Sequence, residues 1–377
     1  MHQTGTKEMM MMMKNDMMIG HREALTLLVT LMSGQVFLSM PRNMALLGDT
    51  AGWLIVLLSG IFSLIGYYFL ASLLKEYPGL DILQISQSLC GKYLGTLFSI
   101  IFFLFFLSIS SLMLRQFAES FIISILPNTP ISIVCFFFLF LLVYGAIQGI
   151  ETLTRVAWFF GPYLLLAFIV TIGFSMPYAD LQLLLPILGK GPLTLLKHSV
   201  FHISLFSNVI LLGVIAPKIR EQDKVSRIGL YSLILAIVIN TLVTATVLIT
   251  FNYTSTSKLV FPIFQLTRLI TLGEFIQRTE AIFVFLWFFT AAILMGGMFY
   301  GTVISFSHSF GITNYRPLVF AMAILIFTIS LFPSSMTETV DLDAFIVSKY
   351  YPLVTFGIPL LLWIVSRLKK KGINTNG

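Results

Sequence analysis

Ten stretches of this chain contain no Asp, Glu, Lys or Arg, and each is long enough to cross a lipid bilayer. A spanning helix needs about 20 mostly apolar residues, and the tolerated range begins near 17. Because hydrocarbon offers the backbone no hydrogen bonds, such stretches fold as helices. They are 24–41, 50–74, 93–114, 120–150, 156–179, 198–217, 228–257, 281–315, 317–337 and 350–366. The sequence therefore predicts an all-α, polytopic membrane protein with ten transmembrane helices.

The bulk composition agrees with this prediction. Charged residues make up 10% of the chain, against about 25% in a typical soluble domain. The mean hydropathy is +0.95. Ten spans in 377 residues leave little chain for a separate soluble domain. We therefore expect a cytoplasmic tail over residues 1–22, one transmembrane domain over 23–371 and a short cytoplasmic end over 372–377.

The basic residues indicate how the chain lies in the membrane. The formal net charge is +7, and 15 of the 23 Lys and Arg residues fall on the side of the predicted membrane that carries the N-terminus. The positive-inside rule makes that side cytoplasmic, which places both termini in the cytoplasm. The basic clusters are thus orientation signals, and we predict no nucleic-acid partner.

Two of the predicted spans contain polar residues and glycine in mid-membrane, where an unbroken helix would not need them. In the first span, Ser33-Gly34-Gln35 precedes Pro41. The sixth span carries a polar group ahead of Gly213, made of His198, His202, Ser204, Ser207 and Asn208. Interrupted helices at matching positions of two halves indicate an inverted-repeat transporter core. The alternative is ordinary helix packing through small residues. We predict that helices 1 and 6 are broken, in a five-plus-five inverted repeat.

Short motifs spread over the whole chain add a family resemblance. In order they are Pro41, Gly48-Asp49-Thr50-Ala51-Gly52-Trp53, Arg115-Gln116-Phe117-Ala118-Glu119, Leu126-Pro127-Asn128-Thr129-Pro130, Gly149-Ile150-Glu151 with Arg155, Phe261-Pro262, Arg278-Thr279-Glu280 with Trp287, and the Lys-rich end. With this order of motifs over ten spans, the chain resembles the spore germination permease family, the B subunit of nutrient germinant receptors, within the amino acid–polyamine–cation transporter superfamily. The family's sixth span often carries an acidic residue where this chain has Ser207 or Asn208.

The resemblance implies a role in sensing a small nutrient, with an amino acid as the first choice. It implies partner receptor subunits, including a lipoprotein, in the inner membrane of the dormant spore. Germinant binding there would lead to ion release and germination. Membrane lipids are the remaining partner.

A broken first helix would expose amides and carbonyls to a small ligand, and the sixth span would face it. Serines of the third span and two residues of the eighth would complete one pocket near the midplane. The expected ligand-binding residues are Gly34, Gln35, Val36, Phe37, Ser108, Ser111, Phe201, His202, Ser204, Asn208, Trp287 and Thr290. Each also has a structural reading; His202, for example, could be a neutral histidine bonded to a neighbouring helix.

Two acid–base pairs have the spacing of helical neighbours. Arg115 and Glu119 lie four residues apart near one end of the third span, and either anchor it or act as a gate. Glu151 and Arg155 repeat this spacing at the start of the fifth span. There we expect a structural pair, with a contact to a partner subunit as the alternative.

Two functions compete on the sequence. The first is a receptor subunit that binds a nutrient and couples binding to ion release. The second is a secondary transporter of amino acids or amines. A membrane-embedded enzyme is not expected, because the spans hold no His-Glu-x-x-His motif, no serine with a base and an acid, and no carboxylate pair. We predict no cofactor and no metal site.

Overall fold

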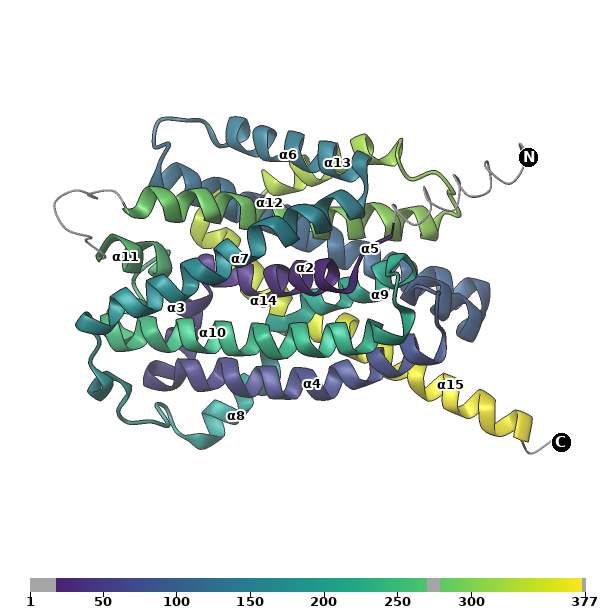
Figure 1. Ribbon diagram of the computed structural model, residues 1–377, viewed down its shortest axis with the longest axis horizontal. Helices are drawn as coiled ribbons and strands as arrows, with labels where there is room; N and C mark the ends of the chain where they lie inside the picture. Colours follow the sequence, from purple (N-terminus) through teal and green to yellow (C-terminus); the bar gives the residue numbers. More distant parts are fainter. Residues whose placement is uncertain (1–17, 270–278, 375–377) are drawn as a thin grey trace, which may run out of the picture.

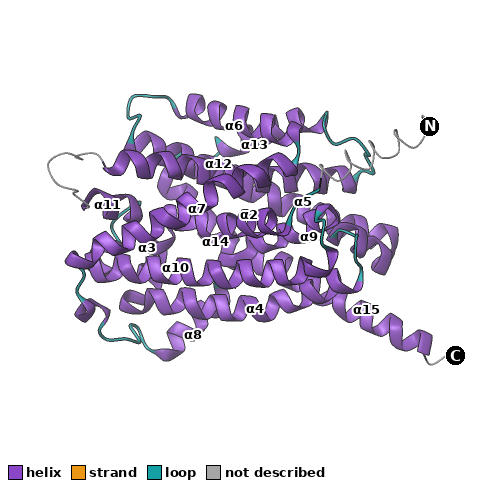
Figure 2. Ribbon diagram, in the orientation of Figure 1, coloured by secondary structure: helices purple, strands orange, loops and turns teal. Residues whose placement is uncertain are grey.

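The computed structural model describes residues 18–269 and 279–374, which form helices joined by short connections (Figures 1 and 2). The longer helices are α4 (Gly52–Glu76), α5 (Ile82–Ser124), α6 (Ile131–Gln148), α7 (Ile150–Ser175), α10 (Val225–Thr256), α12 (Thr279–Ser309) and α15 (Ile358–Asn374). The shorter ones are α2 (His21–Ser33), α3 (Met40–Gly48), α8 (Pro192–Phe201), α9 (Leu211–Ile215), α11 (Pro262–Leu269), α13 (Leu318–Ser330) and α14 (Met336–Lys349). In Figure 1 α2 begins and α15 ends at the same end of the bundle, which we call the terminal end.

Eight helical runs within the described residues are long and apolar enough to cross a membrane. They are Met40–Glu76, Ile82–Ser124, Ile131–Gln148, Ile150–Tyr178, Pro192–Lys218, Gln222–Thr256, Phe283–Ser309 and Met336–Lys370. Two predicted spans fall outside this set on length. The stretch 24–41 is divided between α2 and α3, and the stretch 317–337 contains α13, which has 13 residues. The chain is therefore a multi-pass, all-helical membrane protein.

The first apolar stretch changes direction after Ser33. α2 ends there, and Gly34–Phe37 form a 3₁₀ turn, η1. Leu38 then leaves helical geometry, with φ −94° and ψ −149°, and α3 starts anew with Pro41 in its first turn. Proline suits that position because it has no N–H to leave unbonded. Glycine at position 34 allows a close approach to α12, since a Cβ there would lie 2.5 Å from Leu294 Cδ1.

The apolar stretch 198–217 is also irregular. α8 ends at Phe201, and Ile203–Ile210 form a 3₁₀ stretch, η5, before α9. Hydroxyls from α4 bond to the carbonyls along this region: Ser59 Oγ donates to Ser199 O and Ser63 Oγ to Ile203 O, both at 2.9 Å. These bonds satisfy backbone groups that a regular helix would pair internally.

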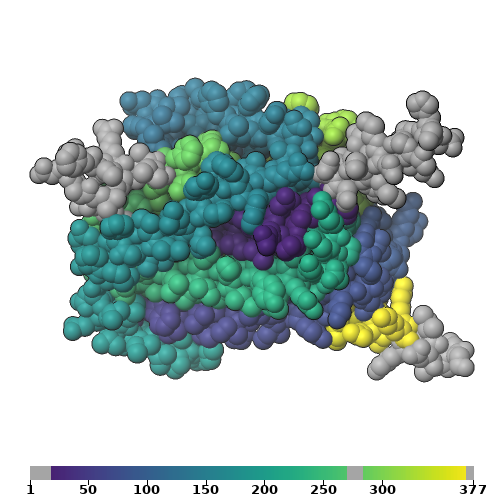
Figure 3. Space-filling model, in the orientation of Figure 1, coloured from purple at the N-terminus to yellow at the C-terminus, as the bar shows by residue number. Residues whose placement is uncertain are grey.

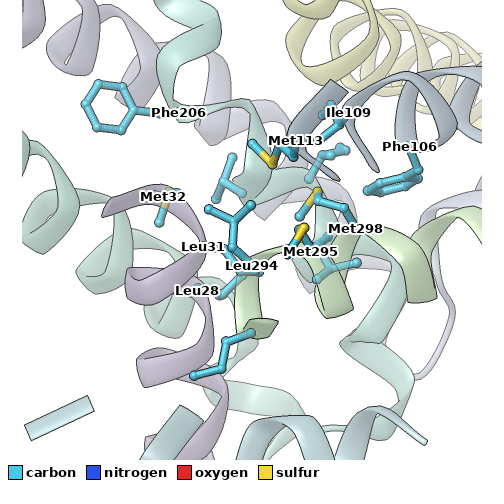
Figure 4. Close-up of a cluster of buried hydrophobic side chains, with 14 of the residues drawn as sticks. Leu28, Leu31, Met32, Phe106, Ile109, Met113, Phe206, Leu294, Met295 and Met298 are labelled. Carbon is cyan, nitrogen blue, oxygen red and sulfur yellow. The ribbon is translucent and has the colours of Figure 1, made fainter. Parts of the chain in front are cut away.

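A buried apolar core joins α2, α5, α12 and η5 (Figure 4). Leu31 of α2 lies beside Leu294 and Met298 of α12 in that view, with Met113 of α5 close by. These side chains are 6% exposed or less. The core fixes α2 against α12, so the irregular residues after Ser33 are held between rigid helices.

Part of the predicted tail over residues 1–22 lies within the described residues. Ile19 is fully buried and forms a parallel β-bridge with Ile219, and α2 starts at His21. At the other end α15 continues to Asn374. The rest of the predicted tail, residues 1–17, and residues 375–377 lie outside the described residues.

Candidate binding site

A cavity of about 240 Å³ lies between α3, α5, the η5 region and α14. We call it the polar cavity, because nine polar side chains line it: Gln35, Ser39, Arg42, Asn43, Gln116, His202, Asp341, Asp343 and Tyr351. Leu38, Met113 and Leu205 form part of its apolar wall. Apolar walls with a few convergent polar groups are typical of sites for small molecules. The volume suits a small metabolite.

Charges of both signs face the polar cavity. α14 supplies two carboxylates, Asp341 and Asp343, and α3 supplies the guanidinium of Arg42. The Gln116 side chain of α5 faces Asp343, which is half-buried. A hydrogen bond fixes the Arg42 side chain, because its Nε donates to Ser257 O at 3.1 Å. The cavity thus presents donors and acceptors to a ligand that carries polar or charged groups.

Two further polar residues of the cavity are fixed by bonds to the protein. Tyr351 Oη and Ser108 Oγ lie 3.2 Å apart, and the Tyr351 ring packs edge-on against Phe105 with centroids 4.8 Å apart. His202 Nδ1 donates to the carbonyl of His198 at 2.9 Å. Because a carbonyl only accepts, this bond places the proton on Nδ1. Such bonds reduce the ordering that a bound ligand would otherwise require.

A second cavity, also about 240 Å³, lies on the other side of η1, between α2, α7, α10 and α12. We call it the apolar cavity. Phe37 borders it and stacks on Phe168 of α7, with centroids 5.2 Å apart. Figure 3 shows α2, in purple, at the bottom of the furrow between α7 and α10. The furrow opens among side chains such as Trp158 and Leu165 that face outward.

The predicted ligand residues that border a cavity are divided between these two. Gln35 and His202 line the polar cavity. Gly34, Phe37 and Thr290 line the apolar cavity. Gly34 and Phe37 are three residues apart in the 3₁₀ turn η1 and so lie on the same side of it, whereas Gln35 points in another direction. Ser108 contacts the polar cavity through Tyr351.

The other predicted ligand residues are engaged elsewhere. Val36 is fully buried, and Ser111 Oγ donates to Leu107 O of its own helix. Asn208 Nδ2 donates to Leu31 O at 2.8 Å. Ser204 is buried, whereas Phe201 is half exposed. Trp287 is buried in an aromatic cluster, where its ring stacks on Phe121 at 5.4 Å.

The sequence prediction did not include the charged residues of the polar cavity, because it considered only stretches without charge. These stretches end at 337 and resume at 350, so they leave out α14, which carries Asp341 and Asp343. Arg42 and Asn43 were also passed over, because they follow the first stretch directly. A usable signal exists: Ser335 accepts a bond from the amide of Glu338, an N-cap that marks the start of a helix within the charged stretch.

The predicted pair of Arg115 and Glu119 is in contact in the structure, and Glu151, the acid of the second predicted pair, contacts Lys218. Arg115 Nε and Glu119 Oε1 lie 2.5 Å apart, and both side chains are buried. Glu151 Oε1 lies 2.7 Å from Lys218 Nζ, a contact that spacing along one helix does not predict. Lys218 also lies over the ring of Tyr300, 5.5 Å from its centroid. The contact therefore joins α7 to the 3₁₀ turn after α9 (η6, Ala216–Lys218) and to α12.

Several contacts connect separate segments at the terminal end. Ile19 N donates to Lys218 O at 2.8 Å, and Arg220 N donates to Ile19 O at 3.0 Å. Asp81 caps α5 by accepting from Gln84 N at 2.7 Å and lies 3.3 Å from His308. Burial raises the pKa of Asp81 above its ordinary value, although attraction to His308 opposes this. These contacts join the chain ahead of α2, the turn after α9, α5 and α12 at the terminal end.

The fold defines a class: a helical, multi-pass membrane protein with a transporter-type architecture. The structure superposes on Mhp1, a nucleobase-cation-symport-1 family transporter solved in a closed conformation with bromovinylhydantoin bound, with a TM-score of 0.56. The match covers 90% of this chain and 79% of that one, at 12% sequence identity, so it shows the fold alone.

Sequence comparison gives the family. The family described as "Spore germination protein" matches residues 18–339, and the chain belongs to it. Among its relatives in Bacillus subtilis (strain 168), spore germination protein KB is 28% identical over 94% of this chain and 95% of its own. Spore germination protein B2 is 24% identical over 96% of this chain and 98% of its own. The resemblance seen in the sequence motifs is confirmed.

Proposed function

We propose that this chain is the membrane-embedded subunit of a spore germinant receptor, which binds a small nutrient in the polar cavity and couples binding to ion release. Partner subunits, including a lipoprotein, would complete the receptor in the inner membrane of the spore, with both termini cytoplasmic. Family membership and the transporter-type fold support the receptor role. The choice of an amino acid as nutrient rests on the family resemblance and on the mixed charges of the cavity.

Ten crossings are part of the proposal. The eight long helical runs become ten if α2 with η1 counts as the first half of a crossing completed by α3, and if α13 crosses as well. α2 and α15 then start and finish at the same end, as an even number of crossings requires. In this arrangement the α2–α3 and α8–α9 segments are the discontinuous first and sixth helices of two five-helix halves.

One observation supports the binding role most directly. Asp343 and Arg42 come from helices far apart in the chain, α14 and α3, and both face one cavity beside the irregular residues of the first span. Charged groups at membrane depth are costly and are retained mainly where they serve a function. A nutrient with an ammonium and a carboxylate would offer each of them a partner.

The test is ligand binding by the purified chain in lipid nanodiscs, with amino acids, sugars and nucleosides screened in parallel. For the best ligand, Asp343→Asn should raise Kd at least about tenfold, since it removes one charged hydrogen bond. Asp223→Asn, at an exposed carboxylate outside both cavities, is the matched control and should leave Kd unchanged. Equal affinity in the two variants would contradict the proposed pocket.

The second candidate is a secondary transporter of amino acids or amines, which the fold favours. Uptake into vesicles that contain this chain alone separates the two functions. Concentrative uptake without partner subunits would support the transporter. A nutrient response that requires partner subunits, with no uptake by the chain alone, would support the receptor.

A further inference from the structure

Another cavity lies at the end of the bundle opposite the terminal end, where α11 follows α10 (Figure 1, left). Its volume is about 360 Å³. The end of α5, the connection 258–261 and one face of α11 form its walls. We call it the basic cavity, because Lys258 and Arg268 line it together with Ser124 and Gln265. It shares no lining residue with the polar or the apolar cavity.

Both charged residues that line the basic cavity are cations. In the part of the chain that the structure describes, no ion pair joins Lys258 or Arg268 to a carboxylate. The Arg268 guanidinium lies over the ring of Phe264, 6.0 Å from its centroid, so the ring holds it at the cavity wall. The segment 258–269, which supplies both cations, contains no Asp or Glu. The cavity therefore attracts anions.

Neutral donors of the basic cavity add to this preference. The Oγ of Ser124 is buried and has no hydrogen-bond partner within the described residues. A buried polar group of this kind usually indicates a partner that is not seen. Gln265 is half-buried and offers a side-chain NH₂ group. Glu119, the acid of α5 nearest to Ser124 in the sequence, is paired with Arg115, so its charge is offset.

The inner wall of the basic cavity is fixed by an aromatic cluster. Phe261 and Phe264 line the cavity and pack on the ring of Trp287, with centroids 6.0 and 6.2 Å apart. Trp287 and Phe261 are 0% and 3% exposed. A wall that is already ordered lowers the entropy cost of binding a ligand.

The outer rim of the basic cavity is apolar. Ile123 and Val260 line it and are 57% and 38% exposed. They lie at the ends of apolar helical runs, next to cations. Basic pockets at this depth of a membrane protein meet the phosphate groups of lipids, and exposed apolar side chains beside them meet the acyl chains.

We propose that the basic cavity binds a phosphate group, which Lys258, Arg268 and the Ser124 hydroxyl hold together. Arginine and lysine are the usual partners of phosphate, and the hydroxyl donates to one of its oxygens. The apolar rim favours the phosphate of an anionic phospholipid over free phosphate, which offers the same chemistry. The bound group would join the end of α5 to α11. Because α11 also packs against η1, it would hold α11 in place beside the first span.

The test is native mass spectrometry of the full chain released from detergent micelles, which resolves each bound lipid. Anionic dioleoyl phosphatidylglycerol is compared with dioleoyl phosphatidylcholine, which has the same acyl chains and no net charge. The Kd of the first phosphatidylglycerol should be about tenfold lower, because its phosphate charge is not offset within the lipid. In a second arm, thermal unfolding in phosphatidylcholine nanodiscs compares sodium phosphate with sodium chloride at constant ionic strength.

Variants locate the site. Lys258→Gln and Arg268→Gln should each raise the Kd of phosphatidylglycerol about three- to tenfold, and Ser124→Ala should raise it less. Both cations are exposed, so these variants should fold, and the Tm without ligand checks this. Lys190→Gln is the matched control, since it removes a positive charge from the same end of the bundle, where Lys190 pairs with Asp49 at 3.3 Å. It should leave the Kd unchanged.

The two arms separate the two sources of phosphate. A rise in Tm with phosphate that Arg268→Gln abolishes, without any preference for phosphatidylglycerol, would support the site and identify free phosphate as its ligand. Equal retention of the two lipids with no effect of phosphate would overturn the proposal. An equal loss of phosphatidylglycerol in Lys190→Gln would overturn it as well, because it would show a general attraction between charges and no defined site.

Discussion

At the scale of single residues, the buried ion pair of Arg115 and Glu119 should have the largest effect on the stability of the fold. Glu119 Oε1 accepts from Arg115 Nε at 2.5 Å, and the two side chains are 8% and 10% exposed. A buried pair adds little net stability, because desolvation offsets the attraction. Removal of one partner alone is costly, since it leaves a buried charge without compensation.

We therefore expect Glu119→Gln to lower the free energy of unfolding by about 3–5 kcal/mol. The double variant Arg115→Met with Glu119→Leu should recover most of the loss, because it buries no charge. Chemical denaturation in detergent micelles measures both. If the pair were a gate and not an anchor, nutrient affinity would change in the double variant while stability would not.

At the scale of elements, the joint between α2 and α12 forms one side of the apolar cavity. Gly34 is the contact point: a Cβ there would lie 2.5 Å from Leu294 Cδ1 and 3.3 Å from Thr290 Cγ2. Thr290 in turn lines the apolar cavity with Gly34. A larger residue forces either the Leu294 side chain or the start of η1 to shift.

Gly34→Val should thus cost about 1–3 kcal/mol of stability and abolish the nutrient response, while the chain still assembles in the membrane. Gly145→Val in α6 is the control, because a Cβ there meets nothing within 4 Å. Thermal unfolding and a germination assay on spores that carry each variant give the two readouts. An unchanged response with Gly34→Val would remove η1 from the binding mechanism.

At the scale of the whole molecule, the contacts at the terminal end close the bundle on one side. The Lys218–Glu151 pair joins η6, the turn after α9, to α7, and the Ile19–Ile219 bridge joins the chain ahead of α2 to the same region. The first and sixth spans are thereby linked at one end, whereas their irregular parts face the cavities.

Loss of the Lys218–Glu151 pair should loosen that end. The pair is partly exposed and contributes about 0–1 kcal/mol, so Lys218→Met should speed amide hydrogen exchange over residues 211–218 by up to about fivefold. Lys190→Met breaks a similar pair with Asp49, 3.3 Å long, at the opposite end. It should leave exchange in 211–218 unchanged; equal effects of the two variants would show that the pair has no local role.

The sequence by itself determined the class of the protein. Long runs without charge indicate membrane helices, because unpaired backbone groups are too costly in hydrocarbon. Ordered motifs indicated the family, which the comparison confirmed.

Only the tertiary structure decided what lies together. Asp343 and Gln116 are far apart in the chain, and α14 was excluded from the predicted spans by its charges, although those charges face a cavity. The partner of Glu151 is 67 residues away, and the amides of Asn208 and Asn240 reach carbonyls more than 170 residues distant. Hydropathy and spacing report on one helix at a time, whereas a site between helices depends on how they pack.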